Sequence, residues 1–319
     1  PMLDILSATV PIFLIVGLGF GVTRVGVLKR RDMTVLTTYV VKVALPVLVF
    51  VNVAGRSLHD ILNPTYLLTY AIAAMVTVAL AWAWNRARRV RPARGAAISL
   101  AVSGTNDGFV GFPIFLILFP EIAGLAVGMD MLVDNVLIIP LAIALFASAS
   151  DEDTRWDRRL ACMVKGVISH PMVIAIAAAL LFTAAGITLP PMIDRAVNLV
   201  ADSTAAVALF SIGGMLVGLK MGAQRADLAA SVIAKLLIMP AVSVGLVMLL
   251  PMLGLPHLGS ELRAAAVLTC ALPSMSMVAA LGEQYGEGEF GAAAMMLSTI
   301  LSFLTLTAWM LVLGLLGWL

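Results

Sequence analysis

The chain has little charge, few aromatic residues and few residues that bind metals or form disulfides. Of its 319 residues, 12% are charged and 7% are aromatic, and it contains three histidines and two cysteines. A soluble globular domain carries about 25% charged residues, so the composition excludes that class. Cys162 and Cys270 fall in different segments, which argues against a disulfide. No pair of His or Cys has the spacing of a zinc site, and the net charge of +2 does not indicate nucleic acid. We expect no metal and no cofactor.

Long apolar runs make up most of the chain instead. Hydrophobic residues account for 61% of it, and the mean hydropathy is +1.06. Ten runs are long enough to cross a hydrocarbon core of roughly 30 Å. They lie near residues 3–22, 33–54, 65–84, 95–119, 122–147, 166–185, 192–219, 228–251, 262–282 and 290–318. Because backbone in lipid must satisfy its hydrogen bonds internally, these continuous runs predict an all-α membrane protein with ten transmembrane helices.

The charges of the loops predict the orientation in the membrane. Most Lys and Arg residues lie in the loops after the first, third, fifth and seventh runs, whereas the other side has only Arg56, Arg195 and Arg263. By the positive-inside rule the first set of loops is cytoplasmic, so both termini are expected outside. A bacterial cytoplasmic (inner) membrane is the predicted location. A cleaved signal peptide is not expected, since no basic segment precedes the first run.

The fourth and ninth runs are interrupted in matching positions. Arg94–Pro113 (RGAAISLAVSGTNDGFVGFP) has a weak echo in Arg263–Gly282 (RAAAVLTCALPSMSMVAALG). The polar stretch Ser148–Arg159 divides the chain into two groups of five runs. We therefore predict two five-helix repeats, residues 1–150 and 160–319. Because five is odd, the second repeat is inverted, and paired interrupted helices in such repeats indicate a transporter's binding site.

The interruptions contain residues that break a helix and residues that bind anions. Gly104, Gly108, Gly111 and Pro113 lie within ten residues of each other, and glycine and proline interrupt the helical hydrogen-bond ladder. Half-helices that restart at membrane depth expose N–H groups and positive dipole ends, which favour an anion. We expect side-chain caps from Asn106 or Asp107 in the first copy and from Ser274 or Ser276 in the second. The alternative is that glycine and proline here only allow close helix packing.

The residues around both interruptions resemble a known family. Asn106–Pro113 (NDGFVGFP) is similar to the Asn-Thr-Gly-aromatic-x-Gly-x-Pro motif of the auxin efflux carrier family, and Ala271–Gly286 resembles that family's ninth-helix signature. Further matches are Ala44–Pro46, Leu209–Gly213 and Ser298–Ser302. The resemblance covers essentially the whole chain.

This resemblance implies a fold and a mechanism. It implies ten helices in two inverted repeats, like the bile acid symporters, with helices 4 and 9 broken and crossing at the substrate site. Helices 1–2 and 6–7 would form a scaffold and a homodimer interface, and helices 3–5 and 8–10 a transport domain that moves as an elevator. The candidate substrate-binding residues are Asn106, Asp107, Gly108, Gly111, Pro113, Pro46, Pro273, Ser274 and Ser276.

Charged residues within the apolar runs are candidates for ion coupling, because they are costly in a membrane. Asp107 replaces the family's usual small hydroxyl residue, so it is expected to be protonated, paired or cation-bound when an anion is present, or else turned away as a cap. Asp130 and Asp134 lie four residues apart on one helix face and either carry ions or accept structural hydrogen bonds. Lys42 either pairs with a carboxylate or extends to the interface, and Lys235 is expected to extend in that way.

Taken together, the sequence and the resemblance predict a secondary active transporter of a small carboxylate such as malonate. It is expected to work by elevator-type alternating access and to be coupled to H⁺. Coupling to Na⁺ and export of an auxin-like aromatic carboxylate remain alternatives, and a channel or sensor is a further one. An enzyme is not expected, since no histidine is positioned to activate the hydroxyls near the interruptions.

Overall fold

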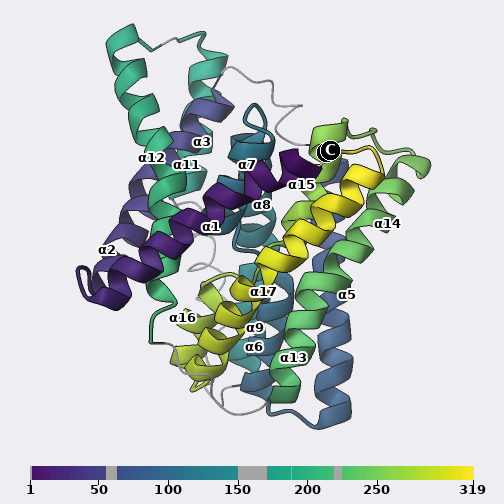
Figure 1. The fold of residues 1–319 in the computed structure, drawn as a ribbon. Helices are drawn as coiled ribbons and strands as arrows, with labels where there is room; N and C mark the ends of the chain where they lie inside the picture. The colour runs from purple at the N-terminus through teal and green to yellow at the C-terminus, as the bar shows by residue number, and fades with distance from the viewer. Residues whose placement is uncertain (1, 55–62, 150–170, 188, 219–224) are drawn as a thin grey trace. The chain divides into compact units, whose positions relative to one another are not determined.

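The structure is a computed structural model that describes residues 2–54, 63–149, 171–187, 189–218 and 225–319 (Figure 1). These residues form helices and no strand. Four short π-helical turns (η) interrupt the α-helices. The elements are α1 (Met2–Val25), α2 (Arg30–Tyr39), η1 (Val40–Ala44), α3 (Leu45–Val53), α5 (Pro64–Arg88), α6 (Pro92–Ser103), η2 (Asp107–Gly111), α7 (Phe112–Leu118), α8 (Ala123–Val133), η3 (Asp134–Ile138), α9 (Ile139–Ser148), α11 (Pro171–Ala184), α12 (Pro191–Met215), α13 (Arg225–Ile233), η4 (Ala234–Ile238), α14 (Met239–Met252), α15 (Ser260–Ala271), α16 (Met277–Gln284) and α17 (Gly288–Leu315).

The all-helical prediction is confirmed for the described residues. Among them, six helical stretches are long and apolar enough to cross a membrane: Arg30–Val51, Pro64–Arg88, Ala123–Ser148, Pro191–Met215, Arg225–Met252 and Gly288–Leu315. Each of the ten predicted runs overlaps a helix in this part of the chain. The ten-helix inverted repeat stays a prediction. Cys162, the start of the sixth run and most of the polar stretch between the repeats lie outside the described residues.

Each π turn ends two residues before a proline. The prolines are Pro46, Pro113, Pro140 and Pro240, which follow η1, η2, η3 and η4. A proline inside a helix donates no hydrogen bond and its ring collides with the carbonyl one turn earlier. A wider turn with i→i−5 bonds relieves that collision, as in the bond from the N–H of Ile139 to the carbonyl of Asp134. The prolines therefore explain where these helices widen.

The chain folds into two compact units, and each takes segments from both halves of the sequence. Unit 1 comprises Pro1–Asn63, Asp107–Met131 and Gly166–Gly218. Unit 2 comprises Pro64–Asn106, Leu132–Lys165 and Leu219–Leu319. The first interruption falls at the boundary, so the residues on its two sides belong to different units.

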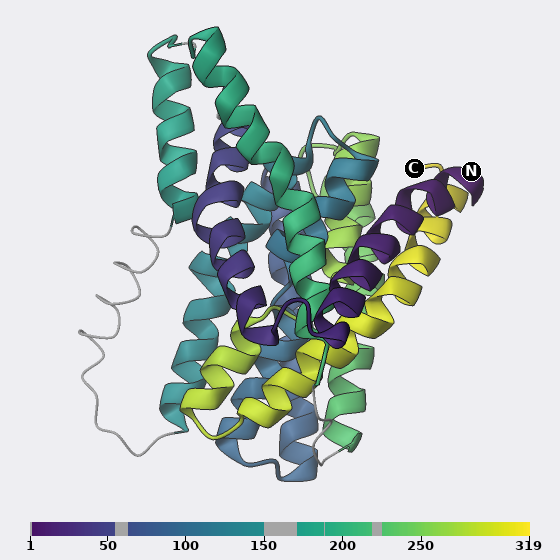
Figure 2. The same ribbon diagram turned by 60° about the vertical axis from the view of Figure 1, so that its left-hand side comes forward.

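In unit 1, glycines allow α1 and α12 to pack closely. A Cβ atom at Gly19 would lie 2.0 Å from the carbonyl oxygen of Phe210, and one at Gly213 would lie 2.0 Å from that of Val16. Small residues permit such backbone contact between membrane helices. The same α12 packs against α2 and α3, and α11 covers another side of α3 (Figure 2).

In unit 2, α5 and α6 form the centre of the packing. α5 contacts α6, α14 and α15, whereas α6 contacts α9, α13, α16 and α17 (Figure 1). Tyr66 and Tyr70, one turn apart on α5, are fully buried. α16 and α17 pack closely as a hairpin because Gly291 has no side chain. A Cβ atom at this position would lie 2.4 Å from the carbonyl oxygen of Val278. This unit carries the crossing described below.

Candidate functional site

Two unwound segments pair with each other within unit 2. α6 and α15 both end inside the predicted membrane runs, and beyond their ends Thr105 and Ser274 form an isolated antiparallel bridge. The N–H of Asn106 donates to the carbonyl oxygen of Pro273 at 2.9 Å. The predicted interruptions are therefore present. The two segments satisfy part of each other's backbone, which is what unwound chain at membrane depth requires.

Further contacts fix this crossing. The N–H of Met275 donates to the carbonyl of Gly104 at 3.3 Å, and a Cβ atom at Gly104 would lie 2.6 Å from the Cε of Met275. The Ser274 hydroxyl donates to the carbonyl of Ala101 at 2.6 Å, and the N–H of Ser274 donates to the Ser298 hydroxyl at 3.1 Å. Ser274 thus bonds a carbonyl of the last turn of α6, which a helix end leaves without an intrahelical donor.

A buried chain of hydroxyl groups connects the crossing to a carboxylate. The Thr105 hydroxyl lies 2.9 Å from the phenol oxygen of Tyr70, which donates to Oδ1 of Asp134. All three side chains are buried. Because Tyr70 has one proton and donates it to Asp134, Thr105 is the donor in its bond to Tyr70. The Thr105 proton is therefore directed away from the crossing while Asp134 is ionised.

Sequence reasoning proposed Asp134 but missed Tyr70 and Thr105. A tyrosine in an apolar run carries a polar tip that usually needs a partner when buried, and this was the available signal. Tyr66, one turn away, makes an equivalent bond: its phenol oxygen lies 3.0 Å from the hydroxyl of Thr269 in α15. α5 thus contacts both interrupted helices through two tyrosines on one face.

The residues beyond the first interruption lie in unit 1. Asp107, Gly108, Gly111 and Pro113 are buried, and Oδ1 of Asp107 accepts the N–H of Gly108 at 3.1 Å. A Cβ atom at Gly108 would lie 3.0 Å from the side chain of Leu45. The π turn therefore packs against the residue before Pro46, which is itself half-buried. These proposed site residues, Pro46 included, belong to the same compact unit.

One expected cap is wrong. Ser276 occupies the N-cap position of α16, but its side chain makes no capping hydrogen bond and is exposed. Its backbone is already helical, with φ −65° and ψ −21°, whereas a capping side chain requires an extended N-cap residue. The carbonyl of Ser276 instead accepts the N–H of Ala279 at 3.1 Å.

The charged candidates have different environments. Asp130 and Asp134 are buried, at 0% and 3% exposure, whereas Lys42 in η1 is exposed. The expectation that Lys235 extends to the interface is wrong: its side chain is fully buried, and its ammonium group donates to the Met239 sulfur at 3.2 Å. Lys235 lies in η4, where the turn before Pro240 widens. No group of three or more His, Cys, Asp or Glu residues in the described ranges is arranged to hold a metal ion.

Comparison with known proteins gives consistent matches over almost the full length. A family model described as "Membrane transport protein" matches residues 4–310. A protein of Rhizobium meliloti (strain 1021) named "Putative malonate transporter" is 25% identical over 316 residues, covering 96% of this chain and 95% of that protein. An "Uncharacterized transporter" of Methanothermobacter thermautotrophicus is 24% identical over 309 residues, covering 95% and 96%.

Proposed function

We propose, from the premise that the chain belongs to this family of membrane transport proteins, that it is a secondary active transporter of a small carboxylate such as malonate. The match also confirms the resemblance to the auxin efflux carrier family. The crossing of the two unwound segments at Thr105 and Ser274 is the observation that supports this function most strongly. Unwound backbone and half-helix ends at membrane depth are how such carriers bind ions and anions.

The substrate is proposed from the site and from the relative. The crossing carries hydroxyl and amide groups, and α16 begins three residues after Ser274, so its dipole favours an anion nearby. The relative named for malonate supports a short dicarboxylate. An auxin-like aromatic carboxylate is the second candidate, because Phe112 and Phe115 lie just beyond the first interruption. Both are buried, which favours the smaller substrate.

Proton coupling is proposed through the chain of Thr105, Tyr70 and Asp134. When Asp134 is ionised, each hydroxyl donates toward it. When Asp134 takes up a proton it becomes a donor to Tyr70, Tyr70 donates to Thr105, and the Thr105 proton becomes available to an anion at the crossing. Proton binding and anion binding then favour each other, and such coupling is reciprocal. The alternative coupling ion is Na⁺, held by unwound carbonyl groups.

The charged surroundings of Asp134 bear on this coupling. α9, which packs on η3, has no titratable side chain, and α5 contributes Tyr70. Asp130 lies one turn earlier on α8, and the buried Lys235 lies on η4, which packs on α5. Asp107, Asp130 and Lys42 remain proposed coupling residues, each of which is tested by neutral substitution.

The proposed mechanism is alternating access by an elevator. The transport domain of helices 3–5 and 8–10 would move against the scaffold of helices 1–2 and 6–7, through which two copies would form a dimer. Expected repeats at residues 1–150 and 160–319 supply the two halves of the site. Both termini are proposed to lie outside a bacterial inner membrane, in accordance with the loop charges.

Thermal stability of the detergent-purified protein tests the substrate proposal. Malonate is expected to raise the melting temperature, since a ligand at 100 times its Kd stabilises by about 2.7 kcal/mol. The rise is expected to be larger at acidic than at neutral pH and independent of Na⁺. Thr105→Val should remove it, whereas Thr69→Val should not, because the Thr69 hydroxyl donates to the carbonyl of Thr65 within α5. No response to any carboxylate would contradict the proposal.

A further inference from the structure

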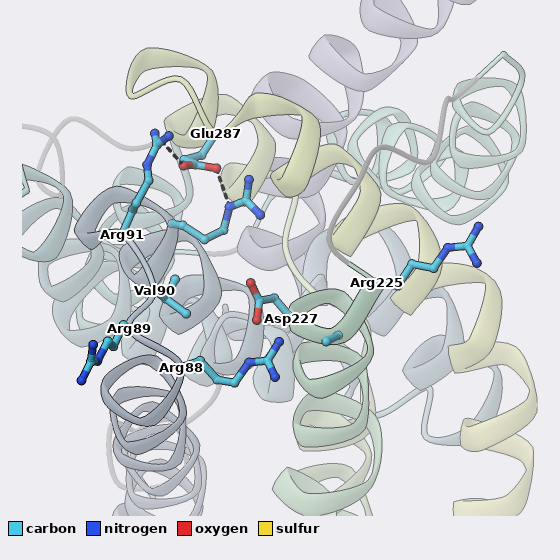
Figure 3. Close-up of a pocket in the computed structure, with 9 residues that line it drawn as sticks. Arg88, Arg89, Val90, Arg91, Arg225, Asp227 and Glu287 are labelled. Atoms are coloured by element: carbon cyan, nitrogen blue, oxygen red, sulfur yellow. Dashed lines mark hydrogen bonds and ion pairs between the residues drawn. The ribbon is translucent and has the colours of Figure 1, made fainter.

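A cavity of about 410 Å³ lies at the end of unit 2 where the polar loops meet (Figure 3). It is formed by the turn between α5 and α6, the first residues of α13, and the turn between α16 and α17. The loop between α5 and α6 is on the side expected to be cytoplasmic. Arg94 lies ten residues before Gly104 on α6, about 15 Å at 1.5 Å per residue, so this cavity is separate from the crossing.

Arginine dominates the lining. Five arginines, Arg88, Arg89, Arg91, Arg94 and Arg225, line the cavity together with two acids, Asp227 and Glu287. The Arg88 side chain lies beside Asp227, whereas those of Arg89 and Arg225 extend outward (Figure 3). An arrangement with more cations than acids is stable only if solvent or a bound anion compensates the excess charge, because like charges gathered in a concave site raise its potential.

Both carboxylates already have partners. Glu287, 3% exposed, pairs with Arg94 and, at 3.5 Å, with Arg91. Asp227, 7% exposed, accepts a hydrogen bond from Nε1 of Trp84 at 3.0 Å. Neither acid is therefore an exposed group that repels an anion from the cavity.

The remaining three arginines form no ion pair within the part of the chain that the structure describes. The guanidinium of Arg88 lies over the ring of Trp84, 5.5 Å from its centroid, which holds it at the wall. Arg89 has φ +52°, a left-handed backbone conformation that residues other than glycine rarely adopt. This conformation ends α5: the N–H of Val90 donates to the carbonyl of Asn85 at 2.9 Å, as in a Schellman cap.

The chemistry of the lining indicates a phosphate group. Guanidinium groups bind phosphate oxygens in pairs with matched geometry. The cavity is of the size that small ligands occupy. Among its described lining residues none is aromatic, so the lining offers no side chain on which a nucleobase could stack. The loop between α5 and α6 is expected on the cytoplasmic side, where clustered arginines suit an anionic lipid headgroup.

We propose that this cavity is a binding site for a phosphate-bearing anion, separate from the transport site. The phosphate belongs either to a lipid headgroup or to a free phosphate. Arg88 binds it from its present position, Arg89 and Arg225 turn their side chains inward to it, and Arg91 and Arg94 stay paired with Glu287.

Melting temperatures and native mass spectrometry of the delipidated protein test this proposal with three probes. These are inorganic phosphate, short-chain phosphatidic acid and short-chain phosphatidylcholine. The variant Arg89→Gln/Arg225→Gln is compared with the control Arg30→Gln/Arg31→Gln, which changes two arginines at the start of α2, outside the cavity. Phosphatidic acid is expected to bind the wild type and the control, and roughly tenfold more weakly to the cavity variant. Phosphatidylcholine is expected to give no specific binding.

The outcomes separate the two sources. Binding of phosphatidic acid together with inorganic phosphate supports a site for the phosphate group itself, and binding of the lipid alone supports a headgroup site. Equal binding to the cavity variant and the control, or no binding of either phosphate probe, overturns the proposal. Malonate should still stabilise the cavity variant. If that response is lost, the cavity belongs to the transport path and the proposal of a separate site is wrong.

Discussion

Thr105 is the residue at which backbone and side chain contribute to one site. Its backbone pairs with Ser274, and its hydroxyl bonds Tyr70, which in turn donates to Asp134. The interruption was predictable from its glycines, and Asp134 was predictable as a buried charge. The link between them was not, because Tyr70 lies in an otherwise apolar run and its partners come from the unwound segment after α6 and from η3.

Tyr70→Phe tests the hydroxyl chain. The variant leaves the ring in place and removes the hydroxyl through which the protonation of Asp134 changes the donor direction at Thr105. The malonate-induced rise in melting temperature should therefore lose its pH dependence. The variant also loses the bonds of the Tyr70 hydroxyl to Thr105 and Asp134, each worth about 0.5–1.5 kcal/mol or more with a charged partner, so it should be less stable. Tyr66→Phe is the matched control: it loses its bond to Thr269 and should be similarly destabilised, yet keep the pH dependence. Unchanged pH dependence in Tyr70→Phe would refute the coupling role of the chain.

At the scale of helices, single residues decide where a helix stays regular. In Ala44-Leu45-Pro46 the proline follows a π turn that ends at Ala44, whereas the similar Ala208-Leu209-Phe210 lies in the continuous α12. Phenylalanine has an N–H and no ring that collides with the preceding turn, so no widening is needed. The sequence allowed both helices to be predicted. The π turns were not predicted, since a proline in a membrane run is equally compatible with a kink.

Gly19→Ala tests the close packing of α1 on α12. The added methyl group would meet the carbonyl of Phe210, and the helices must separate at a cost of about 1–3 kcal/mol. We expect a lower melting temperature in detergent. Gly21→Ala is the control on the same helix: nothing lies within 4 Å of its added Cβ atom, so stability should be equal or higher because alanine favours helix. Equal melting temperatures for both variants would show that this contact is not important.

At the scale of the whole molecule, composition and apolar runs predicted an all-helical membrane protein, and the paired interruptions with the family resemblance predicted a transporter. The family match from residue 4 to residue 310 agrees. The compact units were not predictable in the same way. The chain passes between them at Asn106–Asp107 and again at Met131–Leu132, within the fourth and fifth runs. Hydrophobic patterning locates a helix but does not specify which neighbours each half of it packs against.

Malonate uptake into proteoliposomes tests the central claim most directly. The account predicts saturable uptake that concentrates malonate inside when an inward proton gradient is imposed, that stops when the gradient is collapsed, and that Thr105→Val abolishes while Thr69→Val does not. Flux that rises linearly with malonate concentration, ignores the proton gradient and persists in Thr105→Val would contradict the claim that this protein is a proton-coupled carboxylate carrier with its site at the crossing.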